Sequence, residues 1–153
     1  MEISIKNATK SDLKKILSIQ HSAFKDVAKF YKVREQDLPP LCETLQDLDS
    51  QFQDHIILKA LADDRIIGTV RGKMKQDGFW IERLAVHPEY QNSGIGKSLM
   101  LHIENQAQTT TFKLFTGSKD PKTIHLYESL GYKTYESRKE SEKITLIFMK
   151  KHI

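Results

Sequence analysis

The chain has 153 residues, 39% hydrophobic and 29% charged, a balance typical of one globular domain over residues 1–153 rather than of a disordered or fibrous chain. The formal net charge of +4 is a mild bias, and because the basic residues are scattered it selects no partner. The single cysteine, Cys42, excludes an internal disulfide and a cysteine-based metal site. No apolar run approaches the ~20 residues that a membrane-spanning helix needs, so we expect a cytoplasmic protein with no membrane partner.

The first third of the chain is predicted to form one strand and two helices. Polar and apolar residues alternate over residues 2–6, which is the period of a half-buried strand. Over residues 13–27 apolar residues recur every three or four positions, which predicts a helix whose apolar face is interrupted only by Gln20. Pro39 and Pro40 then interrupt the pattern, and a second short helix is predicted over residues 41–52.

Strands dominate the next part of the chain. Three strands separated by tight turns are predicted over residues 55–62, 65–74 and 79–86. A helix follows over residues 95–107, then a strand over 112–116, a helix over 120–130 and strands over 132–137 and 143–149. The predicted order is β-α-α-β-β-β-α-β-α-β-β, and no repeat or linker divides it, so the chain is predicted to be a single mixed α/β domain.

Two glycines open the helix that follows the third of these strands. Gly94 and Gly96 leave backbone N–H groups unshielded at the positive end of the helix dipole, and Lys97 adds a charge, so the loop suits a phosphate. Neither familiar nucleotide loop fits, because a Walker A loop needs glycine at Gln91 and a Rossmann fingerprint needs it at Leu99. A glycine-rich helix start without a ligand is the simpler alternative.

A second well-punctuated helix is predicted over residues 120–130. Asp120 suits its N-cap, Pro121 its first helical position, and Gly131 the left-handed residue that ends it. Tyr127 falls on the apolar face of this helix. By itself that placement indicates only a partly buried tyrosine whose hydroxyl finds a partner.

Together these stretches resemble the GNAT superfamily of N-acetyltransferases. The run Gln91-Asn92-Ser93-Gly94-Ile95-Gly96 matches the family's Gln/Arg-x-x-Gly-x-Gly/Ala signature between a strand and a long helix. The run Leu126-Tyr127-Glu128-Ser129-Leu130-Gly131-Tyr132 resembles its Leu-Tyr-Glu-x-x-Gly-Phe/Tyr motif. The element order matches the family's domain over nearly the whole chain. The resemblance implies an α/β fold (an α+β mixed sheet) with a central, mostly antiparallel, twisted sheet flanked by helices.

The resemblance also implies how acetyl-CoA is bound. Backbone N–H groups would hold the pyrophosphate, and the strand before the loop would pair with the pantetheine arm; the implied coenzyme-binding residues are Leu84, Ala85, Val86, Gln91, Asn92, Ser93, Gly94, Ile95, Gly96, Lys97, Ser98 and Asp120. Tyr127 would be the general acid, because a phenol with a pKa near ~10 can protonate the departing thiolate. Asp120 stands where the family often has asparagine, so it contacts the pantetheine arm in an altered way or serves only as a helix cap.

The general base is expected on the strand over residues 79–86. In regular alternation one face carries Trp80, Glu82, Leu84 and Val86, and the other carries Ile81, Arg83 and Ala85. Glu82 is the only ionisable group on the first face, which makes it the candidate base for the acceptor ammonium. An ion pair with a cross-strand lysine or arginine is the alternative for Glu82. Trp80 is expected either to line the acceptor pocket or to join the core.

These motifs predict transfer of an acetyl group from acetyl-CoA to a primary amine by direct attack in a ternary complex, with no metal. Cys42 is expected to be a packing residue rather than an acetyl carrier. The sequence selects no acceptor, although the family shapes its acceptor pocket with the segments that correspond to residues 24–53 and 136–143.

Two other classes compete with the enzyme. One is a non-catalytic module that binds acyl-CoA as a sensor. The other is a nucleic-acid-binding domain, which we do not expect because no single strand face interleaves aromatic residues with lysine or arginine. A homodimer formed through the sheet edge is left open, because no sequence feature specifies it.

Overall fold

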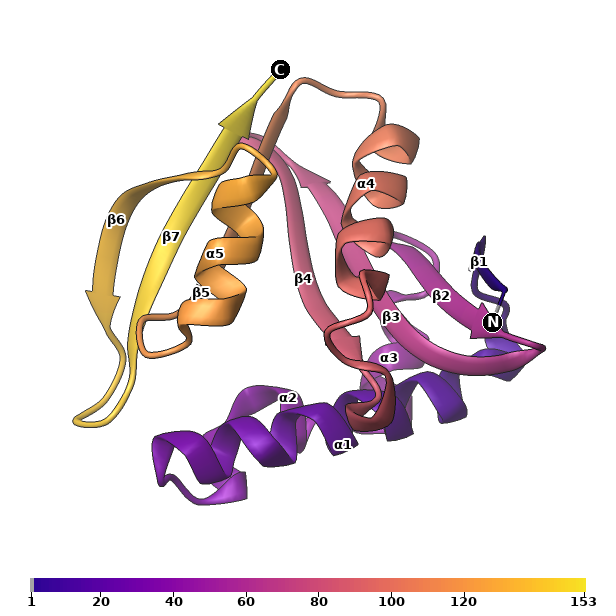
Figure 1. The fold of residues 1–153 in the computed structure, drawn as a ribbon, viewed down its shortest axis with the longest axis horizontal. Helices are drawn as coiled ribbons and strands as arrows, with labels where there is room; N and C mark the ends of the chain where they lie inside the picture. The colour runs from indigo at the N-terminus through magenta and orange to yellow at the C-terminus, as the bar shows by residue number, and fades with distance from the viewer. Residues whose placement is uncertain (1) are drawn as a thin grey trace.

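The computed structural model describes residues 2–153, and they form one seven-stranded sheet with the order β1-β2-β3-β4-β5-β7-β6 (Figure 1). Neighbouring strands are antiparallel except β4 and β5, which are parallel. The strands are β1 (Ile3–Asn7), β2 (Ile56–Ala62), β3 (Arg65–Lys75), β4 (Gly78–Val86), β5 (Thr111–Gly117), β6 (Lys133–Lys139) and β7 (Thr145–His152). The predicted mixed α/β fold with a mostly antiparallel sheet is confirmed.

Helices connect and cover these strands. They are η1 (Lys10–Asp12), α1 (Leu13–Tyr31), η2 (Glu35–Asp37), α2 (Pro39–Cys42), α3 (Leu45–Gln51), η3 (Pro88–Tyr90), α4 (Ile95–Ala107) and α5 (Pro121–Ser129). The prediction of a single helix over residues 41–52 is wrong. Two short helices occupy this region, because α2 starts at the prolines and residues 43–44, which are not helical, separate it from α3. Thr44 caps α3, since its hydroxyl accepts from the Asp47 N–H at 3.2 Å and its own N–H donates to that carboxylate at 2.9 Å.

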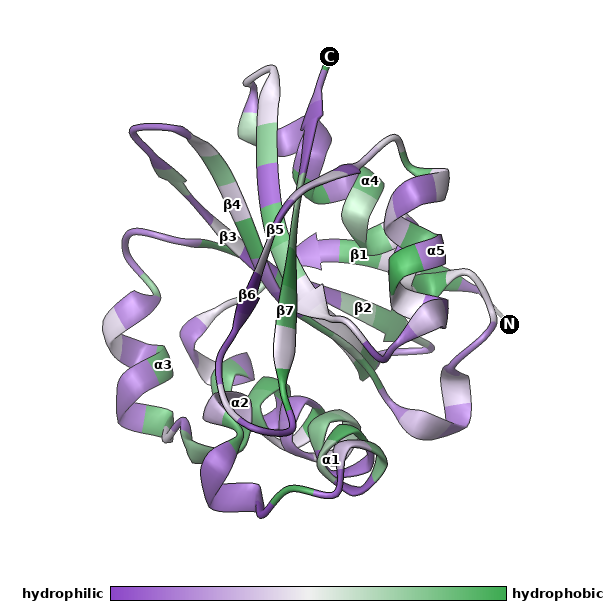
Figure 2. Ribbon diagram, turned by 90° about the vertical axis from the view of Figure 1, so that its left-hand side faces the viewer, coloured by the Kyte–Doolittle hydropathy of each residue, from purple (hydrophilic) through white to green (hydrophobic). Residues whose placement is uncertain are grey.

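The helices lie on opposite faces of the sheet. On one face α4 buries Leu99 and Ile103 in the main core, which also includes Tyr127 of α5 (Figure 1). On the other face α1 buries Leu13 and Ile16 in a second cluster with α3 and β2. At the far edge, all seven residues of β6 are exposed, and this strand is hydrophilic beside the more hydrophobic β7 (Figure 2).

The last residue of α1 reaches across to the end of β5. The Tyr31 hydroxyl accepts a hydrogen bond from the Lys119 N–H at 3.1 Å. It also fills the space that any side chain at Gly117 would occupy, so only glycine allows this close approach. The end of α1 is therefore fixed to the end of β5.

The parallel pair β4 and β5 separates after two residues. Phe79 pairs with Phe112 and Trp80 with Lys113, whereas β4 continues to Val86 with no further partner on β5 (Figure 1). The later residues of β4 are paired on one side only, with β3. An unpaired strand edge thus lies in the middle of the sheet, open to another extended chain.

The predicted alternation of side chains along β4 is wrong after Glu82, because the strand contains a bulge there. The register with β3 shifts between Thr69 and Arg71, and Arg83 there has φ +56°, which is rare for a long side chain. Beyond the bulge, Leu84 packs on the α4 side against the core, whereas Arg83 reaches Glu43 on the α1 side. Arg83, not Leu84, therefore shares the face of Glu82.

Candidate active site

The loop before α4 presents backbone donors to solvent. Gly94 is the N-cap of α4 with φ +84°, and its carbonyl accepts the first helical bond, from Ser98 at 3.0 Å. Within residues 2–153 no group accepts from the N–H groups of Ile95, Gly96 or Lys97. These donors lie at the positive end of a 13-residue helix, which is an arrangement that binds anions.

Two polar side chains of this loop form hydrogen bonds with the backbone of the loop and of the strand before it. The Gln91 side-chain amide donates to the Val86 carbonyl at 3.0 Å, and the Ser93 hydroxyl donates to the Tyr90 carbonyl at 2.5 Å. Asn92 adopts φ +65°, and Gly94 allows a second left-handed residue close by. The donors that stay open are consequently backbone groups, and the polar side chains serve to order them.

The remaining residues with predicted coenzyme roles occupy different environments. Ile95 and Ala85 are buried, Ser98, Leu84 and Val86 are half-buried, and Lys97 is exposed at the mouth of the loop. Leu84 lies along the free edge of β4, and the site that a Cβ would take on Gly96 is 3.8 Å from its side chain and 3.6 Å from that of Leu126. The start of α4, the edge of β4 and the inner face of α5 therefore meet.

Tyr127 stands beside this junction on α5. Its side chain is buried, with its ring 6.0 Å from that of Tyr132 in an edge-on contact. Burial raises the pKa of the Tyr127 hydroxyl, and the negative charge of Asp120 raises it further. The phenol therefore stays protonated across the physiological range, as a general acid must. Within the described residues its hydroxyl has no hydrogen-bond partner, so the core does not provide the partner expected for a tyrosine with a purely structural role.

Asp120 is engaged as a helix cap. Its carboxylate accepts from the Thr123 N–H at 3.1 Å and from the Thr123 hydroxyl at 2.6 Å. Both carboxylate oxygens are used, so the cap alone accounts for an aspartate at this position. A contact between Asp120 and the coenzyme stays a prediction.

Glu82 lies on the opposite face of β4, within a cluster of charges. Its carboxylate is 3.6 Å from His55 Nε2 and 3.7 Å from Nε of Arg71, its cross-strand neighbour. The cross-strand ion pair considered from the sequence is therefore present. His55 chiefly, with Arg71 and Arg83, lowers the pKa of Glu82 against the opposing effect of burial. The same pairing raises the pKa of His55.

Sequence reasoning missed the buried charge cluster behind Glu82. Arg71 is 2% exposed and donates to Gln20 of α1 at 3.0 Å and to Glu43 at 2.5 Å. Arg83 donates to the other Glu43 oxygen at 3.2 Å. Burial opposes ionisation of Glu43, but the two arginines and Gln20 lower its pKa to about 2. The one available signal was Gln20, the polar exception on the apolar face of α1.

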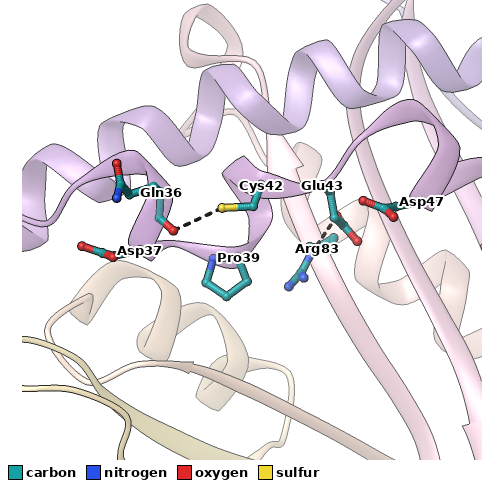
Figure 3. Close-up of a pocket in the computed structure, with 7 residues that line it drawn as sticks. All are labelled: Gln36, Asp37, Pro39, Cys42, Glu43, Asp47 and Arg83. Carbon is teal, nitrogen blue, oxygen red and sulfur yellow. Dashed lines mark hydrogen bonds and ion pairs between the residues drawn. The ribbon is translucent and has the colours of Figure 1, made fainter.

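A pocket of about 350 Å³ adjoins this cluster on the α1 side of the sheet (Figure 3). It is lined by residues of the poorly patterned segment between α1 and β2 and by the bulge of β4: Gln36, Asp37, Pro39, Cys42, Glu43, Asp47 and Arg83. Cys42 is exposed rather than packed, and its thiol donates to the Gln36 carbonyl at 3.3 Å. Trp80 is not among the lining residues, since its indole N–H donates to Asp77 at 2.8 Å and its ring meets Phe148.

Residues 2–153 show neither a candidate metal site nor a helix able to span a membrane. Their His, Cys, Asp and Glu side chains form no group of three arranged to hold a metal ion. Across the same residues, no helix combines the length and the apolar character that crossing a membrane requires.

Comparisons with known proteins agree on the family. The model of the acetyltransferase (GNAT) family matches residues 14–132. A [ribosomal protein bS18]-alanine N-acetyltransferase of Salmonella typhimurium is 30% identical over 86 residues, which are 54% of this chain and 58% of that relative. The chain is thus matched to little more than half the length of this curated relative.

Solved structures share the fold over the whole chain. A PaiA N-acetyltransferase from Thermoplasma acidophilum, in complex with coenzyme A, has a TM-score of 0.86 at 21% identity, with 100% of both chains covered. The ribosomal-protein-S18-alanine N-acetyltransferase of Escherichia coli has a TM-score of 0.80 at 19% identity, covering 99% of this chain and 94% of that one. The family model itself spans the loop, the edge of β4 and Tyr127, and on this ground the chain belongs to the acetyltransferase (GNAT) family.

Proposed function

We propose that this chain is an N-acetyltransferase that moves the acetyl group of acetyl-CoA to a primary amine by direct attack in a ternary complex. The observation that carries the proposal is the free edge of β4, which lies between the open start of α4 and the hydroxyl of Tyr127, unpartnered within the described residues. Family membership and the coenzyme complexes of structural relatives support it. We place the reaction in the cytoplasm.

Each part of acetyl-CoA has a matching group on the protein. The pyrophosphate is held by the N–H groups at the start of α4, with Lys97 beside them. The pantetheine arm, which carries amides, pairs with the unpaired backbone of residues 84–86 in the manner of an added strand. A backbone N–H of the same segment stabilises the negative charge that forms on the thioester oxygen.

Glu82 and Tyr127 divide the proton transfers between the two faces of the sheet. The acceptor nitrogen attacks the thioester carbon, the C–S bond breaks, and the sulfur leaves as a thiolate that takes the proton of Tyr127. The Tyr127 phenolate then recovers a proton, through water, from the nitrogen as it becomes the amide. Glu82, on the α1 side, accepts through water the proton that the acceptor ammonium must lose. His55 stands behind Glu82 and positions its carboxylate. The acceptor enters on the α1 side, where the pocket next to Arg83 lies.

The test separates binding from turnover. Acetyl-CoA affinity is measured by calorimetry, and thiol release is followed with a panel that holds a polyamine, an aminoglycoside, free amino acids and a peptide with an N-terminal alanine. We expect acetyl-CoA to bind and at least one amine to accelerate thiol release at least tenfold. Tight binding without turnover by any amine would instead establish the acyl-CoA sensor. Absence of coenzyme binding would overturn both.

A further inference from the structure

Four aromatic rings gather on the outer face of the sheet, away from α4 and α5. They come from four different strands: Trp80 of β4, Phe115 of β5, Phe148 of β7 and Tyr135 of β6. Phe148 lies at their centre, with ring centroids 5.4 Å from Phe115, 6.4 Å from Trp80 and 6.4 Å from Tyr135. Phe115 is 40% and Tyr135 is 38% exposed, so two of the rings open to solvent. We refer to these four residues as the aromatic face.

Basic side chains alternate with these rings. Lys75 lies 5.4 Å from the Trp80 ring centroid, Lys113 lies 5.4 Å from that of Tyr135, and Lys150 lies 5.1 Å from that of Tyr135. The guanidinium of Arg138 lies 4.6 Å from the Phe148 ring centroid. Each distance is within the range of a cation–π contact.

The charge around the aromatic face is positive overall. The two acids beside the rings are already paired, Asp77 with Lys113 at 3.2 Å and Glu136 with Arg138 at 2.6 Å. Lys75 and Lys150 make no ion pair within the described residues. No helix lies in front of the middle of β6 and β7 in Figure 2, since α1 packs mainly on β3 and β4 and meets β7 only at its start, near Leu146. The aromatic face is therefore an open, cationic surface with stackable rings.

These properties select among the partners that could cover the surface. A second copy of the chain, meeting it through the same face, would place lysine against lysine, which disfavours a symmetric dimer. An acidic peptide would match the charge but would leave the exposed ring faces unused. A single-stranded nucleic acid matches both, because its phosphates meet the cations and its bases stack on the rings.

We propose that the aromatic face binds single-stranded nucleic acid by stacking bases on Tyr135 and Phe115 between Lys75, Lys113 and Lys150. This pattern of rings and cations could not be recognised in the sequence, because it runs across four strands rather than along one. The proposal goes beyond acetyl transfer, since it uses none of the groups assigned to that reaction.

Trp80 provides the readout, because it is the only tryptophan of the chain and belongs to the aromatic face. A twelve-nucleotide poly(U) or poly(A) RNA is titrated into the full chain at two salt concentrations while tryptophan emission is recorded. We expect saturable quenching with an affinity that falls as salt rises, with a slope of about 0.7 for each phosphate neutralised.

Matched variants separate stacking from charge. Tyr135→Ala and Phe115→Ala should each weaken binding roughly 5- to 150-fold, which is the value of one stacked base. Lys150→Glu should weaken it about tenfold and flatten the salt dependence. Phe30→Ala is the aromatic control, since Phe30 is 59% exposed on α1 and its only ring contact within residues 2–153 is with Tyr31, and Lys14→Glu is the charge control. All these variants should retain the wild-type unfolding midpoint and acetyl-CoA affinity.

Three results would overturn the proposal. The first is no quenching by either RNA at low salt. The second is a failure of specificity, in either of two forms. Equal binding of polyglutamate would assign the face to acidic peptides, and RNA binding that Tyr135→Ala and Phe115→Ala leave unchanged would assign the binding to charge alone. The third is a concentration-dependent change of Trp80 emission without RNA, which would assign it to self-association. None of these depends on whether the chain acetylates an amine.

Discussion

On the α4 side of β4 the site consists mostly of backbone, whereas on the α1 side it consists of charged side chains. The start of α4 and the edge of β4 offer N–H and C=O groups whose positions follow from a helix and a strand. Across the sheet, Glu82, Glu43, Arg71 and Arg83 hold one another through ion pairs drawn from β3, β4 and the segment after α1.

The two constructions differ in what a substitution does to them. Backbone donors persist through most side-chain changes and are lost only when something blocks them. A buried charge cluster fails as a unit, because removing one member leaves its partners desolvated and unpaired. The α4 side should therefore tolerate mutation in folding while losing binding, and the α1 side should show the reverse.

The largest effect is expected at Tyr127, on the α4 side. Tyr127→Phe keeps the buried ring and removes the proton donor, so turnover should fall 10²- to 10⁴-fold while acetyl-CoA affinity changes less than about threefold. Steady-state kinetics and calorimetry measure the two. The control is Tyr132→Phe, which removes the 2.6 Å bond to Glu104 and should cost stability rather than turnover. Equal losses of affinity and turnover for Tyr127→Phe would indicate a structural role.

Glu43→Gln tests the α1 side. It leaves Arg71 and Arg83 without their shared counter-charge, so the free energy of unfolding at pH 7 should fall by about 3–5 kcal/mol in urea titrations. Because the pKa of Glu43 is about 2 in the fold and ~4.3 when unfolded, its share of stability is complete above pH ~4.3 and is lost as pH falls toward 2.

The wild-type protein should accordingly lose stability more steeply than Glu43→Gln between about pH 5 and pH 2, by up to roughly 3 kcal/mol. Glu35→Gln, at an exposed acid of η2, is the matched control and should follow the wild type. A Glu43→Gln variant as stable as the wild type at pH 7 would contradict the contrast between the two sides.

Gly96→Glu tests the α4 side. Gly96 is preferred to Gly94 because any residue at Gly94 is strained by its φ of +84°, whereas a Cβ at Gly96 comes no closer than 3.6 Å to its neighbours. The added bulk and charge should weaken acetyl-CoA binding about 100-fold by blocking the anion site, with little change in unfolding midpoint. Leu101→Glu places the same charge farther along α4 and should bind normally. Unchanged affinity for Gly96→Glu would remove the phosphate role.

Glu82→Gln is expected to lower the rate about tenfold, a smaller effect because water can carry the proton elsewhere. The lowered pKa keeps Glu82 ionised through neutral pH. Glu82 should therefore raise the rate at pH values below the pKa of the acceptor amine, where the amine must lose a proton, and should have no effect above that pKa. A pH–rate profile from pH 6 to pH 10 measures this. The profile of His55→Gln should shift in the same sense, and a Glu82→Gln profile parallel to the wild type would exclude Glu82 as base.

The smallest effect is expected for Asp120→Asn. Asparagine and aspartate cap helices about equally well, so thermal unfolding should show a change below about 0.5 kcal/mol, against about 1 kcal/mol for Asp120→Ala. The pKa of Tyr127 should fall, because the Asp120 charge raises it. A tenfold change in acetyl-CoA affinity for Asp120→Asn would show that the side chain at this position contacts the coenzyme.

The same contrast explains which features could be predicted from the sequence. The strand, loop and helix around Gly94 and the helix of Tyr127 are local patterns, so caps, glycines and periodicity located them within a few residues. The cluster around Arg71 joins segments up to 51 residues apart, and no short motif records such a pairing. The alternation along β4 failed at Arg83, because a bulge adds a residue without any proline or glycine to mark it.

The fit between Tyr31 and Gly117 limits how the acceptor side can move. With the ends of α1 and β5 joined, a rigid-body swing of α1 would have to break the Lys119 bond and expose the buried tyrosine. After η2 the chain is also held, because Pro40 is bonded to Gln20, Glu43 is bonded to Arg71, and Leu48 of α3 is fully buried. Motion that admits a bulky acceptor is then confined to η2, where Arg34 bonds to an aspartate only three residues away. The part of the pocket wall formed by Gln36 and Asp37 can thus move on the nanosecond-to-microsecond timescale of loops while the sheet and α1 stay fixed.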